Sequence, residues 1–215
     1  MPVDAPLYPV NLVVAGRRCL VVGGGSVAAR KLAGLRACGA SVHVVAVAVG
    51  PEVRDQAERS PEVTWEERAY AAGEVAGYRL AIAATDDPAV NAAVLADGDT
   101  AGVWVNSADD PAHCSFTLPA VVRRGPVTVA VATGGHSPAL ASWLARSVAA
   151  QVGPEFEVLA GLLSEQRDAI RGSGGSTEGL NWQQALESDM LDLIRAGKVQ
   201  EAKERLQACL FSSSA

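Results

Sequence analysis

The sequence predicts an α/β protein in which a doubly wound parallel sheet comes first, followed by a small α+β segment and a C-terminal helical domain. Three observations support this fold class. Short apolar runs alternate with helical patterns from about residue 18 to residue 110. Beyond Pro111, two apolar runs are joined by a charged turn, which is typical of a hairpin. From Ser137 onward, the apolar residues recur at helical spacing.

The composition narrows the class of protein. With 215 residues, 49% of them hydrophobic and 20% charged, the chain is long enough for one main domain and a smaller attachment. The net charge of -6 is spread along the chain, which argues against a nucleic-acid partner. The sequence has no apolar run of membrane-spanning length and no signal-peptide pattern at its start, so we expect no membrane partner and a cytoplasmic location. The four cysteines form no CxxC pair, and no metal site is predicted.

The first βαβ unit is the clearest local pattern. Arg18 to Gly24 is a short apolar run that ends in three glycines, as a buried parallel strand entering a tight turn would. Val27 to Cys38 has helical spacing, and Gly39 ends that helix. Ser41 to Val49 is a second apolar run. These segments predict two parallel strands joined by a helix.

The alternation continues far enough for a five-stranded doubly wound sheet. Its further predicted elements are a helix from Glu52 to about Arg59, strands at Val63 to Trp65, Arg79 to Ala84 and Gly102 to Asn106, and a helix from Pro88 to about Leu95. After the sheet we expect hairpin strands at Cys114 to Val122 and Val127 to Thr133, helices at Pro138 to Gln151 and Pro154 to Arg171, and a last helical pair between Asn181 and Leu210.

The last helices and the domain boundaries complete the prediction. In the penultimate helix, one apolar stripe contains Leu186, Met190, Leu193 and Ile194. We expect three parts: residues 1–112 form the sheet domain, residues 113–150 form a hairpin and helix segment, and residues 151–215 form a helical domain.

The glycine-rich turn after the first strand predicts a dinucleotide site on a Rossmann-like unit. The motif GGGSVA, from Gly23 to Ala28, fits the pattern G-x-G-x-x-[G/A] between a strand and a helix. In this pattern, glycines permit a sharp turn and a close approach of the pyrophosphate, and the helix N-terminus favours its charge. We therefore expect the dinucleotide to contact Gly23, Gly24, Gly25, Ser26 and Val27. A plain structural turn is the alternative.

The end of the second strand departs from the usual dinucleotide pattern. An acid that binds the ribose is expected there, but the chain reads Val45-Ala46-Val47-Ala48. Backbone groups at Val47 and Ala48 would then have to hold the ribose. We favour NAD over NADP because we expect no cation there to neutralise a 2′-phosphate.

Polar residues also follow the apolar strand that ends at Ala84. Thr85, Asp86 and Asn91 are placed where they could hydrogen-bond the ribose or the amide of the cofactor. Their alternative role is to cap the helix that begins near Pro88.

Candidate residues for the substrate and the chemistry lie further along the chain. Asp109 follows a parallel strand at the edge where doubly wound sheets bind ligands, although an aspartate before proline can also serve a turn or a cap. The small residues between the second hairpin strand and the next helix would let a bulky ligand lie against the backbone. The expected substrate contacts are Asn106, Thr133, Gly134, Gly135 and Ser137.

Four segments in this order resemble the precorrin-2 dehydrogenase family, which includes stand-alone enzymes and the N-terminal part of siroheme synthase. The segments are VVGGGSVAARK, LAIAATDDPAVN, VNSADDPAHCSFTLPA and VAVATGGHSPALA, and the likeness covers about residues 7 to 150. The resemblance implies that precorrin-2, a tetrapyrrole, is oxidised to sirohydrochlorin with NAD as hydride acceptor. It also implies that Asp109 matches the family's essential aspartate and is suited to accept a proton.

Further implications of the resemblance remain open on the sequence. Some members of the family also insert ferrous iron to give siroheme, and the sequence does not separate these from pure dehydrogenases. The resemblance implies a homodimer joined through the hairpin region after Pro111. An alternative function is a non-catalytic NAD-binding regulatory module, which would not need Asp109.

Overall fold

The computed structural model describes residues 6–108, 110 and 113–211. Its chain divides into two compact units. The first contains the chain up to Leu118 together with Gly134–Ser137, and the second contains Pro119–Thr133 and the chain from Pro138 onward. The three-part division expected from the sequence stays a prediction.

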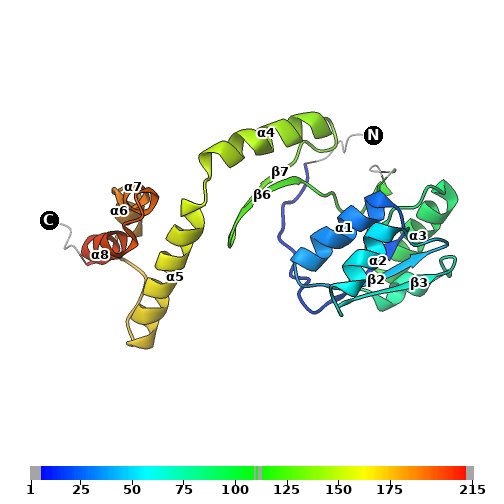
Figure 1. Ribbon diagram of the computed structural model, residues 1–215, viewed down its shortest axis with the longest axis horizontal. Coiled ribbons are helices and arrows are strands. Elements are labelled where there is room, and N and C mark those ends of the chain that lie inside the picture. The colour runs from blue at the N-terminus through cyan, green and yellow to red at the C-terminus, as the bar shows by residue number, and fades with distance from the viewer. Residues whose placement is uncertain (1–5, 109, 111–112, 212–215) are drawn as a thin grey trace. The chain divides into compact units, whose positions relative to one another are not determined.

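The first unit is built on a five-stranded parallel sheet, as the sequence predicted (Figure 1). The strand order is β3-β2-β1-β4-β5, so the chain runs outward from β1 in both directions and the two halves meet beside β1. This is the switch point at which doubly wound sheets bind ligands. The strands are β1 Arg18–Val22, β2 Ser41–Ala46, β3 Val63–Glu67, β4 Leu80–Ala83 and β5 Trp104–Ser107.

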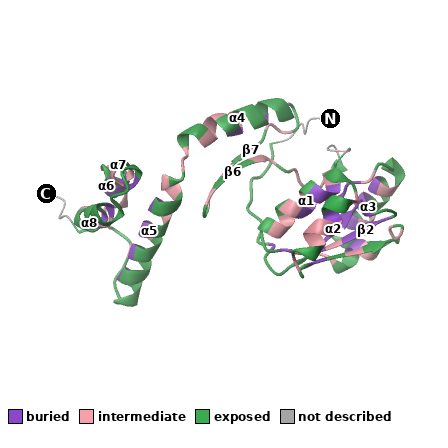
Figure 2. Cartoon of the chain, viewed as in Figure 1, coloured by how far each residue is buried: buried purple, intermediate pink, exposed green. Residues whose placement is uncertain are grey.

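Helices cover both faces of this sheet. One face packs against α1 (Ser26–Ala37) and α2 (Pro51–Glu58), and the other against α3 (Pro88–Ala101) and the short 3-10 helix η1 (Glu74–Gly77). The apolar residues of the central strands β1, β2 and β4 are buried on both faces, which explains the apolar runs at these strands in the sequence (Figure 2).

Helix α3 is longer than the prediction that ended near Leu95. It continues to Ala101 and stops at Gly102, which has a φ of 66° and adopts the left-handed conformation common after a helix. Gly98 lies inside this added turn. A Cβ there would lie 2.2 Å from Val105 Cγ2, so this glycine permits the helix to pack closely on β5.

The second unit begins with the predicted hairpin, made of β6 (Ala120–Arg124) and β7 (Val127–Val131). The expectation that the first hairpin strand starts at Cys114 is wrong. Residues before Pro119 are tied to β5, because Ser115 N–H donates to the Val105 carbonyl at 2.9 Å and the Asn106 side chain donates to the Phe116 carbonyl at 2.9 Å. This segment therefore cannot pair with β7.

The remaining helices of the second unit confirm the expected helical character of the C-terminal region. They are α4 Pro138–Gln151, α5 Glu155–Gly172, α6 Trp182–Leu186, α7 Met190–Arg195 and α8 Val199–Leu210. Helices α5 to α8 share one buried apolar cluster. The predicted last pair of helices is thus three helices.

The predicted apolar stripe is interrupted. Met190 and Ile194 are buried in α7, but Leu186 ends α6 and is exposed. The break has a local cause at Ser188. Its hydroxyl donates to the Ala185 carbonyl at 2.6 Å and accepts the Met190 N–H at 3.4 Å, which replaces helical hydrogen bonds.

Candidate functional site

The glycine turn lies between the ends of β2 and β4, where two backbone segments press against it. Gly23 has a φ of 126°, and a Cβ there would lie 2.2 Å from the Ala84 carbonyl oxygen. A Cβ on Gly24 would lie 2.1 Å from the Ala48 carbonyl oxygen. Both obstacles are backbone atoms, so only glycine fits at these two positions. The first two glycines of the motif are therefore required by the packing of the protein itself.

Gly25 differs from its two neighbours because a Cβ there would meet nothing within 4 Å. It is the N-cap residue of α1, and no side chain caps the helix. The first N–H groups of an α-helix have no partner within the helix, and they carry a partial positive charge. The open space at Gly25 therefore lies at the start of α1, where the N–H groups of Ser26 and Val27 have no partner within the helix. This arrangement fits the pyrophosphate of a dinucleotide.

The loop after β2 is pinned to the glycine turn. Gly50 N–H donates to the Gly24 carbonyl at 2.9 Å, and the side chain of Val47 is 81% exposed. Val47 and Ala48 therefore lie beside the turn, at the position where a Rossmann unit holds the adenosine ribose. Contact of these two residues with a cofactor stays a prediction.

The structure brings a cation and an acid to this loop that the sequence analysis did not find there. Glu67, at the end of β3, accepts the Val49 N–H at 3.0 Å, and Arg54 of α2 donates to Glu67 at 2.6 Å. Arg54 also donates to the Val49 carbonyl at 3.0 Å. The Val49 N–H bond and the Arg54 charge hold the pKa of Glu67 below its ordinary value. The expectation that no cation stands near the loop is wrong.

The polar residues after β4 bind mainly to one another. The Asn91 side-chain oxygen accepts from the Thr85 hydroxyl at 2.8 Å and from the Thr85 N–H at 3.2 Å, and its amide nitrogen donates to the Thr85 carbonyl at 2.9 Å. Asn91 is buried, whereas Asp86 is exposed. The side-chain cap of α3 is Asp87, which accepts the Ala89 N–H at 2.9 Å. Cofactor contacts of Thr85, Asp86 and Asn91 stay predictions.

Ala108, the residue that follows β5, lies at the ligand-binding edge of the sheet. Ala108 N–H donates to the Ala83 carbonyl at 2.9 Å, so residue 108 still lies beside the end of β4. Asp109, the predicted catalytic residue, is outside the described residues. Asn106 is buried with its amide on the Phe116 carbonyl, and Ser107 N–H donates to the Cys114 sulfur at 3.0 Å. These contacts hold Cys114 and Phe116 beside β5.

The loop that leads into α4 contains the other predicted substrate residues. Gly134 and Gly135 have φ values of 59° and 81°, so both need a glycine. Gly134 and Ser137 belong to the compact unit that contains the sheet, and Thr133 belongs to the second unit. Their contact with a substrate stays a prediction.

Lys31, on α1 and near Cys114, is a further polar residue that the sequence analysis did not single out. Burial lowers its pKa below the ordinary value, while the nearby Cys114 has the opposite, smaller influence. The only hint in the sequence is its place in the segment VVGGGSVAARK.

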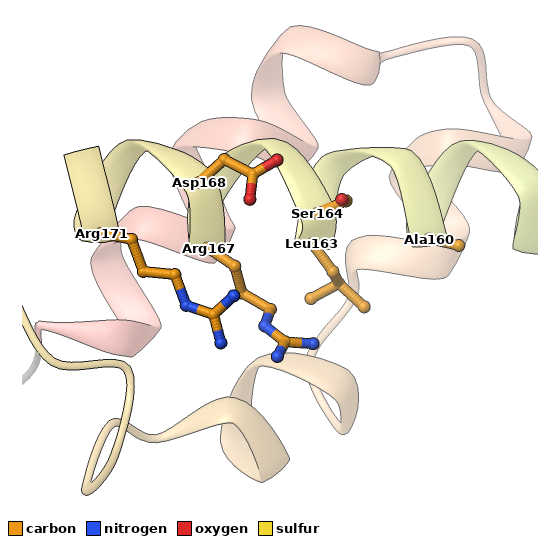
Figure 3. Close-up of a pocket in the computed structure, with 6 residues that line it drawn as sticks. All are labelled: Ala160, Leu163, Ser164, Arg167, Asp168 and Arg171. Carbon is orange, nitrogen blue, oxygen red and sulfur yellow. The ribbon is translucent and has the colours of Figure 1, made fainter.

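A separate hollow of about 390 Å³ lies on α5 in the second unit. Figure 3 shows Leu163, Arg167 and Arg171 extending from the same side of this helix, while Asp168 and Ser164 extend from the other side. Arg167, Asp168 and Arg171 are exposed. The hollow is therefore an open helix surface, and the glycine turn is the better candidate for a ligand site.

The described residues contain neither a cluster of metal-binding side chains nor a membrane-spanning helix. Within the described part of the chain, no three His, Cys, Asp or Glu side chains gather as a metal site would require. None of the helices among the described residues combines the length and the apolar character that a membrane span needs.

Comparison with known proteins assigns the family. Residues 10–120 match the model of the family described as "Putative NAD(P)-binding". The chain belongs to this family. The matched residues include the glycine turn and the whole parallel sheet. This site therefore binds a nicotinamide dinucleotide.

Individual relatives extend the similarity over nearly the whole chain. It is 36% identical to the siroheme synthase of Nitrosococcus oceani and 36% identical to that of Chromobacterium violaceum, over 94% and 97% of this chain. These alignments cover 43% and 44% of the relatives, so the chain spans less than half of their length.

A solved structure shares the fold. It is named "SirC, precorrin-2 dehydrogenase", and it superimposes with a TM-score of 0.69 and 24% sequence identity. The superposition covers 94% of this chain and 99% of that structure. The resemblance in fold includes the helices that follow the sheet.

Proposed function

We propose that this protein oxidises precorrin-2 to sirohydrochlorin, with NAD as hydride acceptor, in siroheme biosynthesis. The observation that carries the proposal is the open space and uncapped helix N-terminus at Gly25, in a chain that is 36% identical to siroheme synthases along nearly its whole length. The solved structure of similar fold is named a precorrin-2 dehydrogenase, which supports the same reaction.

Different residues at the carboxyl edge of the sheet bind different parts of the dinucleotide. The backbone of Gly25, Ser26 and Val27 holds the pyrophosphate, with Gly23 and Gly24 shaping the turn. The loop at Val47 and Ala48 supports the adenosine ribose. When bound, NAD supplies the acceptor for a hydride. Thr85, Asp86 and Asn91 border the site on the other side of β1.

The oxidation removes a hydride and a proton from the substrate. Ser107 is the last residue of β5, and the N–H of the next residue, Ala108, donates to the Ala83 carbonyl of β4. Asp109 is the next residue in the sequence and lies outside the described residues; its carboxylate would accept the proton as the hydride leaves. Asn106 supports the segment from within, and the loop of Thr133, Gly134, Gly135 and Ser137 offers small residues and backbone N–H groups to a tetrapyrrole that carries many carboxylates.

A homodimer through the hairpin region fits the surface of the second unit. Val121 on β6 and Leu140 and Trp143 on α4 are exposed apolar side chains, with 38%, 47% and 56% of their surface accessible. Helix α4 packs on β6, and exposed apolar side chains of this size on neighbouring elements are typical of a protein interface. We propose that they contact a second copy of the chain.

Insertion of ferrous iron into sirohydrochlorin is a second reaction that the same edge could serve, with iron as a substrate. It stays a prediction, and so does the alternative of a regulatory module that binds NAD without chemistry. The products formed distinguish iron insertion and the regulatory module from the dehydrogenase reaction.

The test uses purified protein, anaerobic precorrin-2 and NAD, with ferrous ion added in a second stage. The wild type should form NADH together with sirohydrochlorin, and iron insertion faster than the uncatalysed rate would add the chelatase. Asp109→Asn should lower turnover by about a hundredfold or more and leave NAD binding unchanged. NAD binding without either product would support the regulatory module, and full turnover by Asp109→Asn would remove Asp109 from the mechanism.

A further inference from the structure

The loop after β2 contains no acid, but the neighbouring strand brings one to the same place. We propose that Glu67, held by Arg54, accepts the adenosine ribose hydroxyls and excludes a 2′-phosphate, so that it sets the preference for NAD. This inference rests on the proposed function, because it assigns a role within the same dinucleotide site.

The register of the sheet places Glu67 where the usual acid would be needed. In the pairing of β2 with β3, Glu67 lies opposite Ala46, the last residue of β2. Parallel strands end at the same edge of a sheet, so the ends of β2 and β3 present their residues together. A carboxylate from β3 can therefore take the position that an acid at the end of β2 occupies in other Rossmann units.

Contacts with the loop fix one half of this carboxylate and leave the other half available. Glu67 Oε1 accepts both the Val49 N–H at 3.0 Å and the Arg54 guanidinium at 2.6 Å. Glu67 Oε2 accepts no hydrogen bond from the described residues, and the side chain is 42% exposed. An ionised carboxylate has room for further donors, and ribose hydroxyl groups are suitable ones.

The loop also connects Glu67 to the pyrophosphate position. Gly50 is hydrogen-bonded to Gly24, and the Ala48 carbonyl lies against the Cα of Gly24 closely enough to exclude a Cβ. Val49, between these two residues, carries the N–H that Glu67 binds. In a dinucleotide the adenosine ribose follows directly on the pyrophosphate, so this is the loop that it meets.

The contacts of Arg54 leave its guanidinium unavailable to bind a 2′-phosphate. Its Nε donates to the Val49 carbonyl at 3.0 Å, its terminal nitrogen donates to Glu67, and its guanidinium lies 4.6 Å from the centre of the Trp65 ring. The charge of Arg54 is thereby neutralised by Glu67. A 2′-phosphate would have to approach the Glu67 carboxylate, and like charges at short range repel.

Glu66 provides a matched control on the same strand. Successive residues of a strand point to opposite faces of the sheet, and Glu66 pairs with Arg68 at 2.6 Å and faces His43. It is an acid paired with an arginine at the same distance as Glu67, but among the described residues it makes no hydrogen bond or ion pair with the loop after β2.

The experiment measures equilibrium binding of NAD and NADP to the full chain by calorimetry. The wild type should bind NAD at least about tenfold more tightly than NADP, since a hydrogen bond to a charged group has that effect. Glu67→Gln keeps an oxygen for the Val49 N–H but releases the Arg54 charge, so NAD affinity should fall and NADP affinity should rise. The ratio of the two affinities should change by about tenfold or more toward NADP. Glu66→Gln should leave both affinities unchanged.

Two further variants test whether the Arg54 charge can bind a 2′-phosphate once Glu67 no longer neutralises it. Arg54→Gln should retain NAD binding within about threefold and bind NADP no better than the wild type. Adding Arg54→Gln to Glu67→Gln should abolish the gain in NADP affinity. Tighter NADP binding by Arg54→Gln alone would overturn the inference.

The outcomes separate this inference from the proposed function. If the wild type binds NAD but Glu67→Gln leaves the ratio of affinities unchanged, Glu67 only supports the loop and the inference fails alone. If the wild type binds neither dinucleotide, the proposed function fails and this inference fails with it.

Discussion

The loops after β2 and β4 press on the glycine turn from opposite sides, and they are stabilised in different ways. The loop after β2 places the Ala48 carbonyl against Gly24 and is held by groups from other elements, Glu67 and Arg54. The loop after β4 places the Ala84 carbonyl against Gly23, but its polar side chains bind within the loop and to Asn91.

This difference indicates which side of the turn can respond to a ligand. Polar atoms that are already satisfied inside a loop contribute shape and rigidity. A carboxylate with one oxygen fixed and the other without a partner among the described residues can bind something further. We therefore expect changes around Asn91 to affect stability first, and changes around Gly25 and Glu67 to affect binding first.

The largest effect is expected where the two loops meet the turn. Gly24→Ala should lower the free energy of unfolding by about 3 kcal/mol, because its Cβ would overlap a backbone carbonyl that cannot move without shifting the loop. Urea denaturation followed by circular dichroism measures this. Gly34→Ala, inside α1 with nothing within 4 Å of its Cβ, is the control and should raise stability by about 1 kcal/mol. Equal stability of Gly24→Ala and wild type would contradict the tight approach.

Gly25 should separate binding from folding. Gly25→Val adds a branched side chain to open space at the start of α1, so the unfolding free energy should stay within about 1 kcal/mol of the wild type. The same side chain would occupy the place of the pyrophosphate, and NAD affinity should fall by at least about tenfold. Calorimetric titration with NAD measures the affinity. Unchanged affinity would place the dinucleotide elsewhere.

Asn91 tests the self-contained loop after β4. Asn91→Ala removes the partners of the Thr85 N–H, hydroxyl and carbonyl groups, and we expect a loss of about 1 to 2 kcal/mol in unfolding free energy. Asp86→Ala, at an exposed neighbouring position, should change it by less than about 0.5 kcal/mol. Thermal and urea unfolding of both variants give the comparison, and equal losses would show that the loop does not depend on Asn91.

The smallest effect concerns the acid limb of the pH dependence of stability. The Val49 N–H and the Arg54 charge hold the pKa of Glu67 below its ordinary value. Its contribution is therefore fully present above the unfolded-state pKa of glutamate, about 4.3, and is lost as the pH falls through the lower folded-state pKa. Glu67→Gln should show a slightly shallower loss of stability with falling pH than the wild type. An identical slope would show that the contact does not favour the ionised form.

The sheet could be predicted from the sequence because each strand is a buried apolar run between turns, and each run is a local signal. The glycine motif likewise identified the turn, since its residues are consecutive. The motif did not separate Gly25, which faces open space, from Gly23 and Gly24, which pack against carbonyls. That distinction depends on Ala48 and Ala84, which the fold brings in from two other strands.

The features that the sequence analysis missed all depend on contacts between elements. Glu67 and Arg54 reach the loop after β2 from β3 and α2, so inspecting the residues next to Val47 could not find them. The end of α3 depends on how Gly98 packs against Val105, and the break after Leu186 depends on one serine hydroxyl. Periodicity alone does not contain this information.

The proposed oxidation is tested most directly by measuring both of its products in one anaerobic sample of precorrin-2, NAD and protein. NADH and sirohydrochlorin should form in a one-to-one ratio with the wild type, and Gly25→Val should form both more slowly at the same concentration of NAD. Sirohydrochlorin formed at the same rate without NAD, or no product from a protein that binds NAD, would contradict it.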